Sequence, residues 1–354
     1  MATWILAGGD FTVDFADNAK LFPGSGDTIE TLTSPVLNGL RSFLLNTTSR
    51  YLLFQPPPAL AAGSASVWGH FHHRYIANNS SAYGFLHLSG ETYGHLLFAV
   101  HNTGVMTVYR ANDAGVIGFA VPATLLGTGT FLMKRNTWYS IQFEVTIHES
   151  AGIVNTWING VPDLNLTGID TKQASGTDAV TRVYVAGQAN FDSIFIGDNS
   201  GANTGHPGEV RVDCMWPDAN GSDRANGGVG EMTRSAGSDE ALLVDDLASA
   251  AGIADYIYAD APNERCSLNV AALTNAGGTL LAVQVTVYAT KNEPGACGFK
   301  IYLLSGGTRY YSDEFFPSWG LWDFYRWIWD QHPLNGAWTE AVFNACEFGV
   351  ERTT

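Results

Sequence analysis

The stretch that decides the fold is Trp138-Tyr-Ser-Ile-Gln-Phe-Glu-Val-Thr-Ile-His-Glu149, in which apolar and polar residues alternate. The odd positions from Tyr139 to Ile147 are all apolar, and the even positions between them are mostly polar. Successive side chains of a strand point to opposite faces of the sheet. The alternation therefore predicts a half-solvated strand in an antiparallel sheet.

Similar strand patterns, separated by turn signals, lie on both sides of this stretch. Asn159-Gly160 follows the next apolar run, and Asn-Gly is a strong signal for a tight hairpin turn. Strands at ~8–12-residue spacing with turns between them are typical of a sandwich or jelly roll, so an all-β fold is predicted. Further strands are predicted over 11–15, 66–76, 105–110, 116–120, 153–158, 191–196 and 209–216.

The composition changes at Asp218, where a polar, Gly-rich stretch begins that resembles a linker. After an acidic, Ala/Leu-rich segment at 238–254, in which a helical turn is predicted, the β pattern returns. We therefore predict a concanavalin A-like jelly roll over 1–225, a linker over 226–261 and a small β-sandwich over 262–354. The predicted strands of the second domain include 281–288, 299–304 and 342–350.

Charge and hydropathy exclude several classes of partner. Lys and Arg number 18 and Asp and Glu 34, so the formal net charge is −16 and nucleic-acid binding is disfavoured. The first basic residue is Lys20, so no secretory signal peptide is predicted. The uncharged run 114–133 is long enough to cross a membrane, but its glycines and Pro122 suit turns and short buried strands, so no membrane span is predicted.

No constellation of residues indicates catalysis. A glycoside hydrolase needs two carboxylates about 5–9 Å apart across the sugar. Glu209 and Asp213 share a strand face in this prediction, but Arg211 lies between them and is expected to pair with one. The chain is therefore predicted not to be an enzyme, and no cofactor is predicted.

A histidine cluster offers a metal hypothesis. His70 and His72 would project from one face of a strand, about 7 Å apart, with His73 beside them. The alternative is a solvated strand face that also carries Trp68 and Arg74. A third ligand would have to come from His87, His95 or His101.

Several segments, in order, resemble those of one group of proteins. The two strand segments around Asn155-Thr-Trp-Ile-Asn-Gly160 are similar to the paired strands of laminin-G-like, concanavalin A-like jelly rolls. The series that follows, over about 100–354, resembles bacteriophage virion proteins of the tail or tail-fibre type, except that Ser193 stands where a second Asp is usual. The segments that carry this likeness are Asp170–Lys172, Phe191–Gly201, Gly208–Asp213, Trp216–Gly221, Asn335–Thr339 and Asn344–Val350.

The resemblance implies a structural protein of the virion, made in the host cytoplasm, that assembles with copies of itself or with other virion proteins and contacts the host surface. An alternative is an adhesin that binds a surface glycan, and another is a capsid decoration or head-fibre protein. A polysaccharide depolymerase is the least favoured alternative, because the carboxylate pair is missing.

Two oxygen-rich segments are candidate calcium sites. Asp218, Asn220 and Asp223 place oxygen ligands as calcium loops do, but the glycine is fourth rather than sixth as in the EF-hand pattern, and no glutamate stands at position twelve. Laminin-G-like domains hold calcium at a rim loop in some cases, which is what the resemblance implies here. The alternative is a turn built from Asp, Asn and Gly. The second segment offers Asp192, Asp198 and Asn199.

The aromatic stretch 311–338 is predicted to contact another subunit. As a strand or as a helix, residues 321–330 are apolar on more than one side, and a domain of this size has one core to cover one face. Trp and Tyr are enriched at interface centres. The alternative is that a loop or the first domain covers the second face. The predicted interface residues are Trp319, Trp322, Phe324, Trp327 and Trp329.

Overall fold

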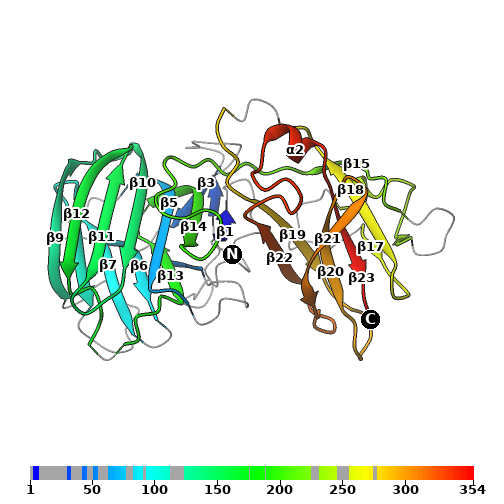
Figure 1. The fold of residues 1–354 in the computed structure, drawn as a ribbon, viewed down its shortest axis with the longest axis horizontal. Coiled ribbons are helices and arrows are strands. Elements are labelled where there is room, and N and C mark those ends of the chain that lie inside the picture. Colours follow the sequence, from blue (N-terminus) through cyan, green and yellow to red (C-terminus); the bar gives the residue numbers. More distant parts are fainter. Residues whose placement is uncertain are drawn as a thin grey trace. The chain divides into compact units, whose positions relative to one another are not determined.

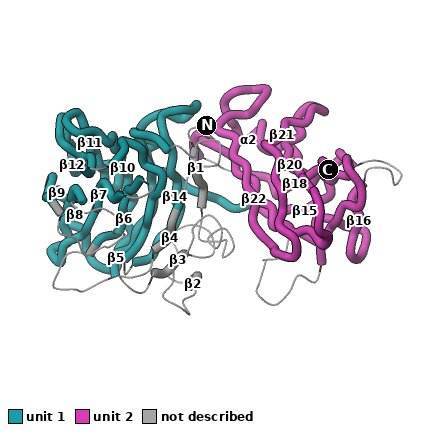
Figure 2. The backbone as a smooth tube through the Cα atoms, turned by 90° about the horizontal axis from the view of Figure 1, so that it is seen from below, with its two compact units in different colours: residues 1–214 teal, residues 215–354 magenta. Residues whose placement is uncertain are grey.

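The chain forms two compact units, Met1–Cys214 and Met215–Thr354, shown in teal and magenta in Figure 2. Their regular secondary structure is nearly all strand, which confirms the predicted all-β class. The structure is a computed structural model, and it describes residues 3–7, 30–32, 42–45, 51–54, 63–76, 83–90, 93–111, 123–174, 176–187, 189–224, 231–244, 255–273 and 277–354.

Unit 1 is a jelly roll of two packed sheets (Figure 1). Its core lies between the sheets, where Phe71 contacts Phe85 and Phe98 contacts Phe143, with ring centroids 6.0 and 6.2 Å apart. The eight-stranded sheet runs β12 (Val161–Ile169), β11 (Gly152–Ile158), β10 (Trp138–Thr146), β5 (Ser66–Tyr75), β14 (Ala189–Asp198), β3 (Ser42–Leu45) and β2 (Glu30–Leu32), with β1 (Thr3–Ala7) also on β14. The six-stranded sheet runs β4 (Tyr51–Phe54), β13 (Arg182–Ala186), β6 (Tyr83–Ser89), β7 (Gly94–Val100), β8 (Val105–Ala111) and β9 (Ala123–Leu132).

Strand β10 confirms the predicted alternation on its core side. Every apolar residue from Tyr139 to Ile147 on that side is at most 5% exposed. The other side is not the solvated face that was predicted, because Ser140 is 4% and Gln142 0% exposed. A polar surface in the middle of the sheet is therefore covered.

Three of the predicted strands of unit 1 have other outcomes. Residues 209–216 form no strand, and Arg211 pairs with Asp213 there (Nε–Oδ1 2.7 Å), as expected. The predicted strands at 11–15 and 116–120 lie outside the described residues. The uncharged run 114–133 is expected to form short buried strands. Its described part, β9, is instead partly exposed, with Leu125 54% and Leu132 63% exposed.

Unit 2 packs a five-stranded sheet against a two-stranded ribbon, β19 (Val283–Ala289) with β22 (Asp323–Trp329). Its core includes Ile301 and Leu303 of the sheet and Trp329 of the ribbon. The sheet runs β15 (Pro217–Asn220), β18 (Arg265–Val270), β23 (Glu347–Arg352), β20 (Phe299–Ser305) and β21 (Thr308–Phe315).

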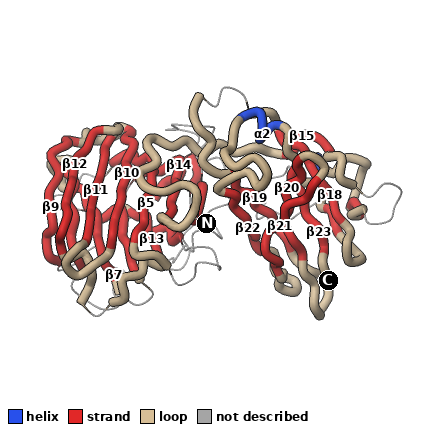
Figure 3. The backbone as a smooth tube through the Cα atoms, in the orientation of Figure 1, coloured by secondary structure: helices blue, strands red, loops and turns tan. Residues whose placement is uncertain are grey.

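One segment of unit 2 corrects the sequence pattern. The predicted strand 342–350 begins instead within α2 (Glu340–Asn344), the short helix seen in Figure 3, and becomes strand only at β23. The helix is capped by Thr339, whose side chain accepts a hydrogen bond from the Val342 N–H. An N-cap of this kind stabilises the first turn and overrides the strand tendency of Val342 and Phe343.

The division of the chain corrects the predicted domain boundaries of 225 and 262. Strand β15 pairs with β18, so residues 217–220 belong to unit 2. Within the predicted linker 226–261, β16 (Thr233–Arg234) pairs with β17 (Ile257–Tyr258), and the 3-10 helix η2 (Ala241–Leu243) supplies the predicted helical turn. Glu240 is fully buried there. The polar composition predicts a linker, but in the structure Arg224 and Arg234 pair with Glu231 and Glu240 within unit 2.

Candidate functional site

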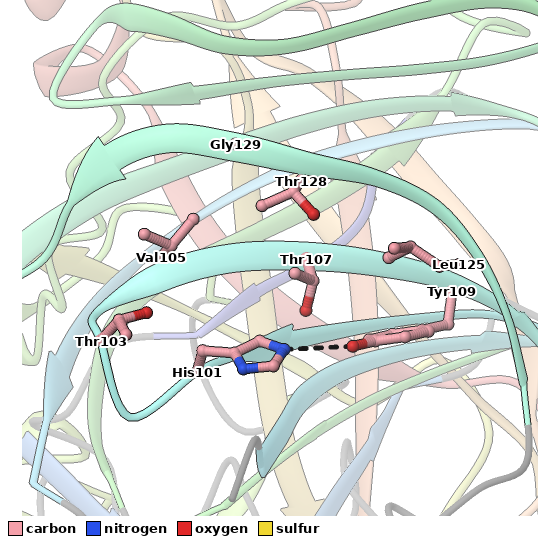
Figure 4. A pocket seen from close by; sticks show the side chains of 8 residues that line it. All are labelled: His101, Thr103, Val105, Thr107, Tyr109, Leu125, Thr128 and Gly129. Carbon is pink, nitrogen blue, oxygen red and sulfur yellow. Dashed lines mark hydrogen bonds between the residues drawn. The ribbon is translucent and has the colours of Figure 1, made fainter.

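An open pocket lies on the outer face of the six-stranded sheet, on β8 and β9 (Figure 4). Met106 and Val108 of β8 point into the core, so the alternating side chains of Thr107 and Tyr109 point outward into the pocket. The pocket volume is about 420 Å³, within the range of small-molecule sites. Its lining residues are His101, Thr103, Val105, Thr107, Tyr109, Leu125, Thr128 and Gly129.

The pocket offers hydroxyl groups and an aromatic ring. His101 Nε2 and the Tyr109 hydroxyl lie 3.2 Å apart in a hydrogen bond, which fixes both side chains (Figure 4). The hydroxyl of Thr107, a residue that is 3% exposed, donates to Ala99 O over 3.4 Å. The lining contains no carboxylate, lysine or arginine. This chemistry suits a neutral ligand that carries several hydroxyl groups.

Sequence reasoning had missed this pocket. His101 was considered only as a third metal ligand, and Tyr109 and Thr128 were not considered. The one local signal was the alternation of Val105, Thr107 and Tyr109 along a predicted strand. Nothing in the sequence shows that β9 lies beside that strand and completes the pocket.

The outer face of the other sheet carries a buried polar relay. His70 is 0% exposed, and its Nδ1 lies 3.1 Å from the carbonyl oxygen of Ser193. Its Nε2 lies 3.0 Å from the hydroxyl of Ser140, which Gln142 Nε2 also approaches to 3.2 Å. On the far side, the Oε1 of Gln142 bonds the Nε2 of His206.

The direction of every hydrogen bond in the relay follows from its first member. The carbonyl of Ser193 can only accept, so His70 carries its proton on Nδ1. Its Nε2 therefore accepts from the Ser140 hydroxyl, whose oxygen accepts from the Gln142 amide. His206 then donates to Gln142. The relay links the buried sheet to a segment that follows β14.

A backbone irregularity makes the relay possible. Ser193 has φ of 49°, a left-handed conformation that few non-glycine residues adopt, and it lies in a bulge of β14 against β5. The carboxylate of Asp192 accepts the Ser193 N–H at 2.6 Å. The bulge turns the Ser193 carbonyl toward His70.

A serine beside a histidine base suggests a nucleophile. However, burial lowers the pKa of His70 to about 3, with the nearby His72 and His206 adding to the effect. A base of that strength is poorly matched to neutral pH. The relay therefore has the geometry of a nucleophile–base pair without its basicity, and we treat it as structural.

The structure places His70 and His72 on one face of β5, as the sequence predicted, with ring centroids 4.7 Å apart. His73 points to the opposite side and packs between Phe85 and Phe191. The alternative of a solvated face is wrong, because His70 and Trp68 are at most 1% exposed. Among the described residues, no group of three or more His, Cys, Asp or Glu side chains is placed to hold a metal ion.

The candidate calcium ligands near residue 220 are engaged in other contacts. The Oδ1 of Asn220 accepts the N–H groups of Glu240 and Ala241, at 2.8 and 3.1 Å. The carboxylate of Asp223 pairs with Arg265 and Arg309. Asp218, in β15, is exposed.

The second calcium candidate segment is a set of local turns. Asp198 Oδ1 accepts the Ser200 N–H at 2.8 Å, and Asn199 Oδ1 accepts the Gly205 N–H at 3.1 Å. Asp192 binds the Ser193 N–H. These contacts match the turn alternative, and the calcium hypothesis stays a prediction.

The aromatic interface candidates divide between core and surface. Trp329 is 7% exposed and belongs to the core of unit 2, against which Trp327 packs. Phe324 and Trp322 both stack on Tyr288, with ring centroids 4.3 and 5.2 Å away. Trp322 is 40% and Trp319 63% exposed.

Comparison with known proteins identifies only distant fold likeness. No family model and no curated protein matches the chain. Among solved structures, Trypanosoma rangeli sialidase aligns at 10% identity and a TM-score of 0.33, covering 50% of this chain and 28% of the sialidase. Caenorhabditis elegans galectin LEC-6 aligns at 11% identity and a TM-score of 0.29, covering 46% of this chain and 100% of the galectin. Alginate lyase Aly36B aligns at 12% identity and a TM-score of 0.34, covering 56% of this chain and 96% of the lyase. None of these bears on the ligand or activity of this chain.

Proposed function

We propose that this chain is a non-enzymatic binding component of a bacteriophage virion, and that the pocket on β8 and β9 holds a neutral carbohydrate of the host surface. The virion assignment rests on the sequence resemblance. The carbohydrate rests on one observation: a pocket of about 420 Å³ lined by threonine hydroxyls and by the hydrogen-bonded pair Tyr109 and His101, without a charged carboxylate or guanidinium. Sugars present hydroxyl groups for such partners and C–H faces that pack on aromatic rings.

A glycan array followed by calorimetry with the best neutral oligosaccharide tests the carbohydrate proposal. Tyr109→Ala should weaken binding at least about tenfold, because about 1.4 kcal/mol of contact and hydrogen bonding is removed. Tyr109→Phe should retain part of the affinity, since the ring remains. Leu132→Ala is the matched control, because Leu132 is 63% exposed on β9 and does not line the pocket. Unchanged affinity in Tyr109→Ala would place the ligand elsewhere, and an array without any neutral ligand would reject the proposal.

A second role, assembly with other subunits, is favoured by the surface of unit 2. The segment 315–322 carries no charged side chain, and four of its apolar side chains are 40–65% exposed. Exposed apolar clusters of this kind are unusual on a monomer and mark contact surfaces. The four are Phe316, Trp319, Leu321 and Trp322.

Sedimentation velocity over a range of concentrations tests the assembly role. If the segment is a self-association surface, the double variant Trp319→Ser/Trp322→Ser should sediment as a folded monomer under conditions in which the wild type forms larger species. A wild type that stays monomeric at every concentration would leave only a heterologous virion partner as the occupant. Identical association in both proteins would exclude the segment as the contact.

A further inference from the structure

Residues 199–213, which we call the strap, contact the polar outer face of the eight-stranded sheet. The ring of His206 lies 3.9 Å from that of Trp157 on β11, and its Nε2 donates to Gln142 on β10. Glu209 Oε1 lies 3.4 Å from His72 Nε2 on β5. The strap is thus attached through one histidine of its own and one histidine of the sheet, on the sheet opposite to the pocket.

The sheet beneath the strap accommodates His70 and His72 as neutral, buried imidazoles. In the relay, His70 Nε2 is the acceptor for the Ser140 hydroxyl, so a proton added at Nε2 leaves the buried Ser140 hydroxyl proton without that acceptor, while the bonds from Gln142 to Ser140 and from His206 to Gln142 can remain. His72 uses Nε2 toward Glu209, and its Nδ1 is buried with no partner among the described residues. A proton added at that nitrogen would be a buried, unsatisfied donor.

The charges around the relay act in both directions. Glu209 favours the charged form of His72, and Glu144 favours that of His206, but burial outweighs both and lowers the pKa of each. His70 has no carboxylate that acts on its charge, while His72 and His206 both oppose it. The titratable groups that face the relay are therefore His70 and His72 from β5, Glu144 from β10, Asp192 from β14, and His206 and Glu209 from the strap.

We propose that the strap is an acid-released cover over this face. Release frees the imidazoles to bind protons in water, and it uncovers Trp157, Gln142 and the two histidines of β5 together. The closed state binds fewer protons than the released state, so acid favours release. The effect begins as the pH falls below 6.5, the ordinary pKa of histidine, and continues until about 3, where burial places the pKa of His70.

Hydrogen exchange of the strap in the full chain tests this proposal. After correction for intrinsic rates, exchange over 199–213 should rise by up to about a hundredfold between neutral pH and pH of about 4.5, two units below the ordinary histidine pKa. The variant His70→Gln keeps an acceptor for Ser140 but cannot titrate, so it should lose most of this rise. His148→Gln, a change at an exposed histidine in the turn after β10, should keep it.

A second variant decides the matter if His70→Gln fails to fold. His206→Phe retains a ring against Trp157 and removes the donor to Gln142. It should speed exchange of the strap already at neutral pH and reduce the further rise in acid. Corrected exchange that does not depend on pH in the wild type would overturn the proposal. So would an acid response in His70→Gln or His206→Phe equal to that of the wild type.

Discussion

At the residue scale, Asp223 shows what the oxygen-rich stretch after β15 does. Its carboxylate pairs with Arg309 and Arg265, its side chain is only 10% exposed, and the pairing with Arg309 lowers its pKa below the ordinary 3.8. Removing one partner of such a group leaves the other charges uncompensated. We expect Asp223→Ala to lower the free energy of unfolding of unit 2 by about 3 kcal/mol. Asp313→Ala, at an exposed site of the same unit, should change it by less than about 0.5 kcal/mol.

The pH dependence of the same variant follows from the sign of the pKa shift. Because the pKa of Asp223 is lower in the folded state, its contribution is complete above about 3.8 and is lost as the pH falls through the lowered folded value. The stability difference between wild type and Asp223→Ala, measured by urea unfolding, should therefore shrink only in strong acid. A calcium-dependent difference at neutral pH would instead support the calcium hypothesis for this loop.

At the element scale, β10 and β22 show which buried faces of a strand can be predicted from its sequence pattern and which cannot. The alternation in β10 identifies its core side because burial by the facing sheet needs only a period of two. It cannot show that Ser140 and Gln142 are covered, because His206, which completes the cover, lies far along the chain from both. The bulge at Ser193, on which the relay depends, has no local signal either. In β22, the two-sided apolar pattern predicts burial of both sides, but only its last two residues, Ile328 and Trp329, are buried, at 4% and 7% exposed.

The two ends of the aromatic stretch should respond differently to substitution. Trp329 lies in the core of unit 2, so the double variant Trp327→Ala/Trp329→Ala should lose about 3–5 kcal/mol or leave the unit unfolded. Trp319→Ser/Trp322→Ser removes side chains that are 63% and 40% exposed, and should change stability by about 1 kcal/mol or less. Near-UV circular dichroism during urea unfolding measures both. Equal losses in the two variants would mean that the whole stretch is core.

At the scale of the whole molecule, the boundary between the two units determines which fragment of the chain is expected to fold independently. Sequence composition placed the boundary at 225 and a linker up to 261, because Gly, Asp and Asn are typical of linkers. The structure gives described residues of 217–240 partners in unit 2 instead. Arg224 and Arg234 both bind Glu231 and Glu240, Ser222 donates to Glu347, and β15 pairs with β18. A compositional measure counts charged residues but does not show which of them pair with one another.

A fragment 215–354 is therefore expected to melt cooperatively, whereas the fragment 262–354, which matches the predicted domain, should not. The shorter fragment keeps β18, β23, β20 and β21, but it leaves one edge of the sheet without β15 and removes Asp223 from Arg265 and Arg309. Two arginines would then lie beside the sheet without their carboxylate, at a cost of several kcal/mol by the reasoning applied to Asp223, which is comparable to the ~5–15 kcal/mol stability of a whole domain. Thermal unfolding followed by circular dichroism distinguishes the two. A sharp transition in 262–354 at the temperature found for 215–354 would show that residues 215–261 contribute nothing to this unit and that the compositional boundary was correct.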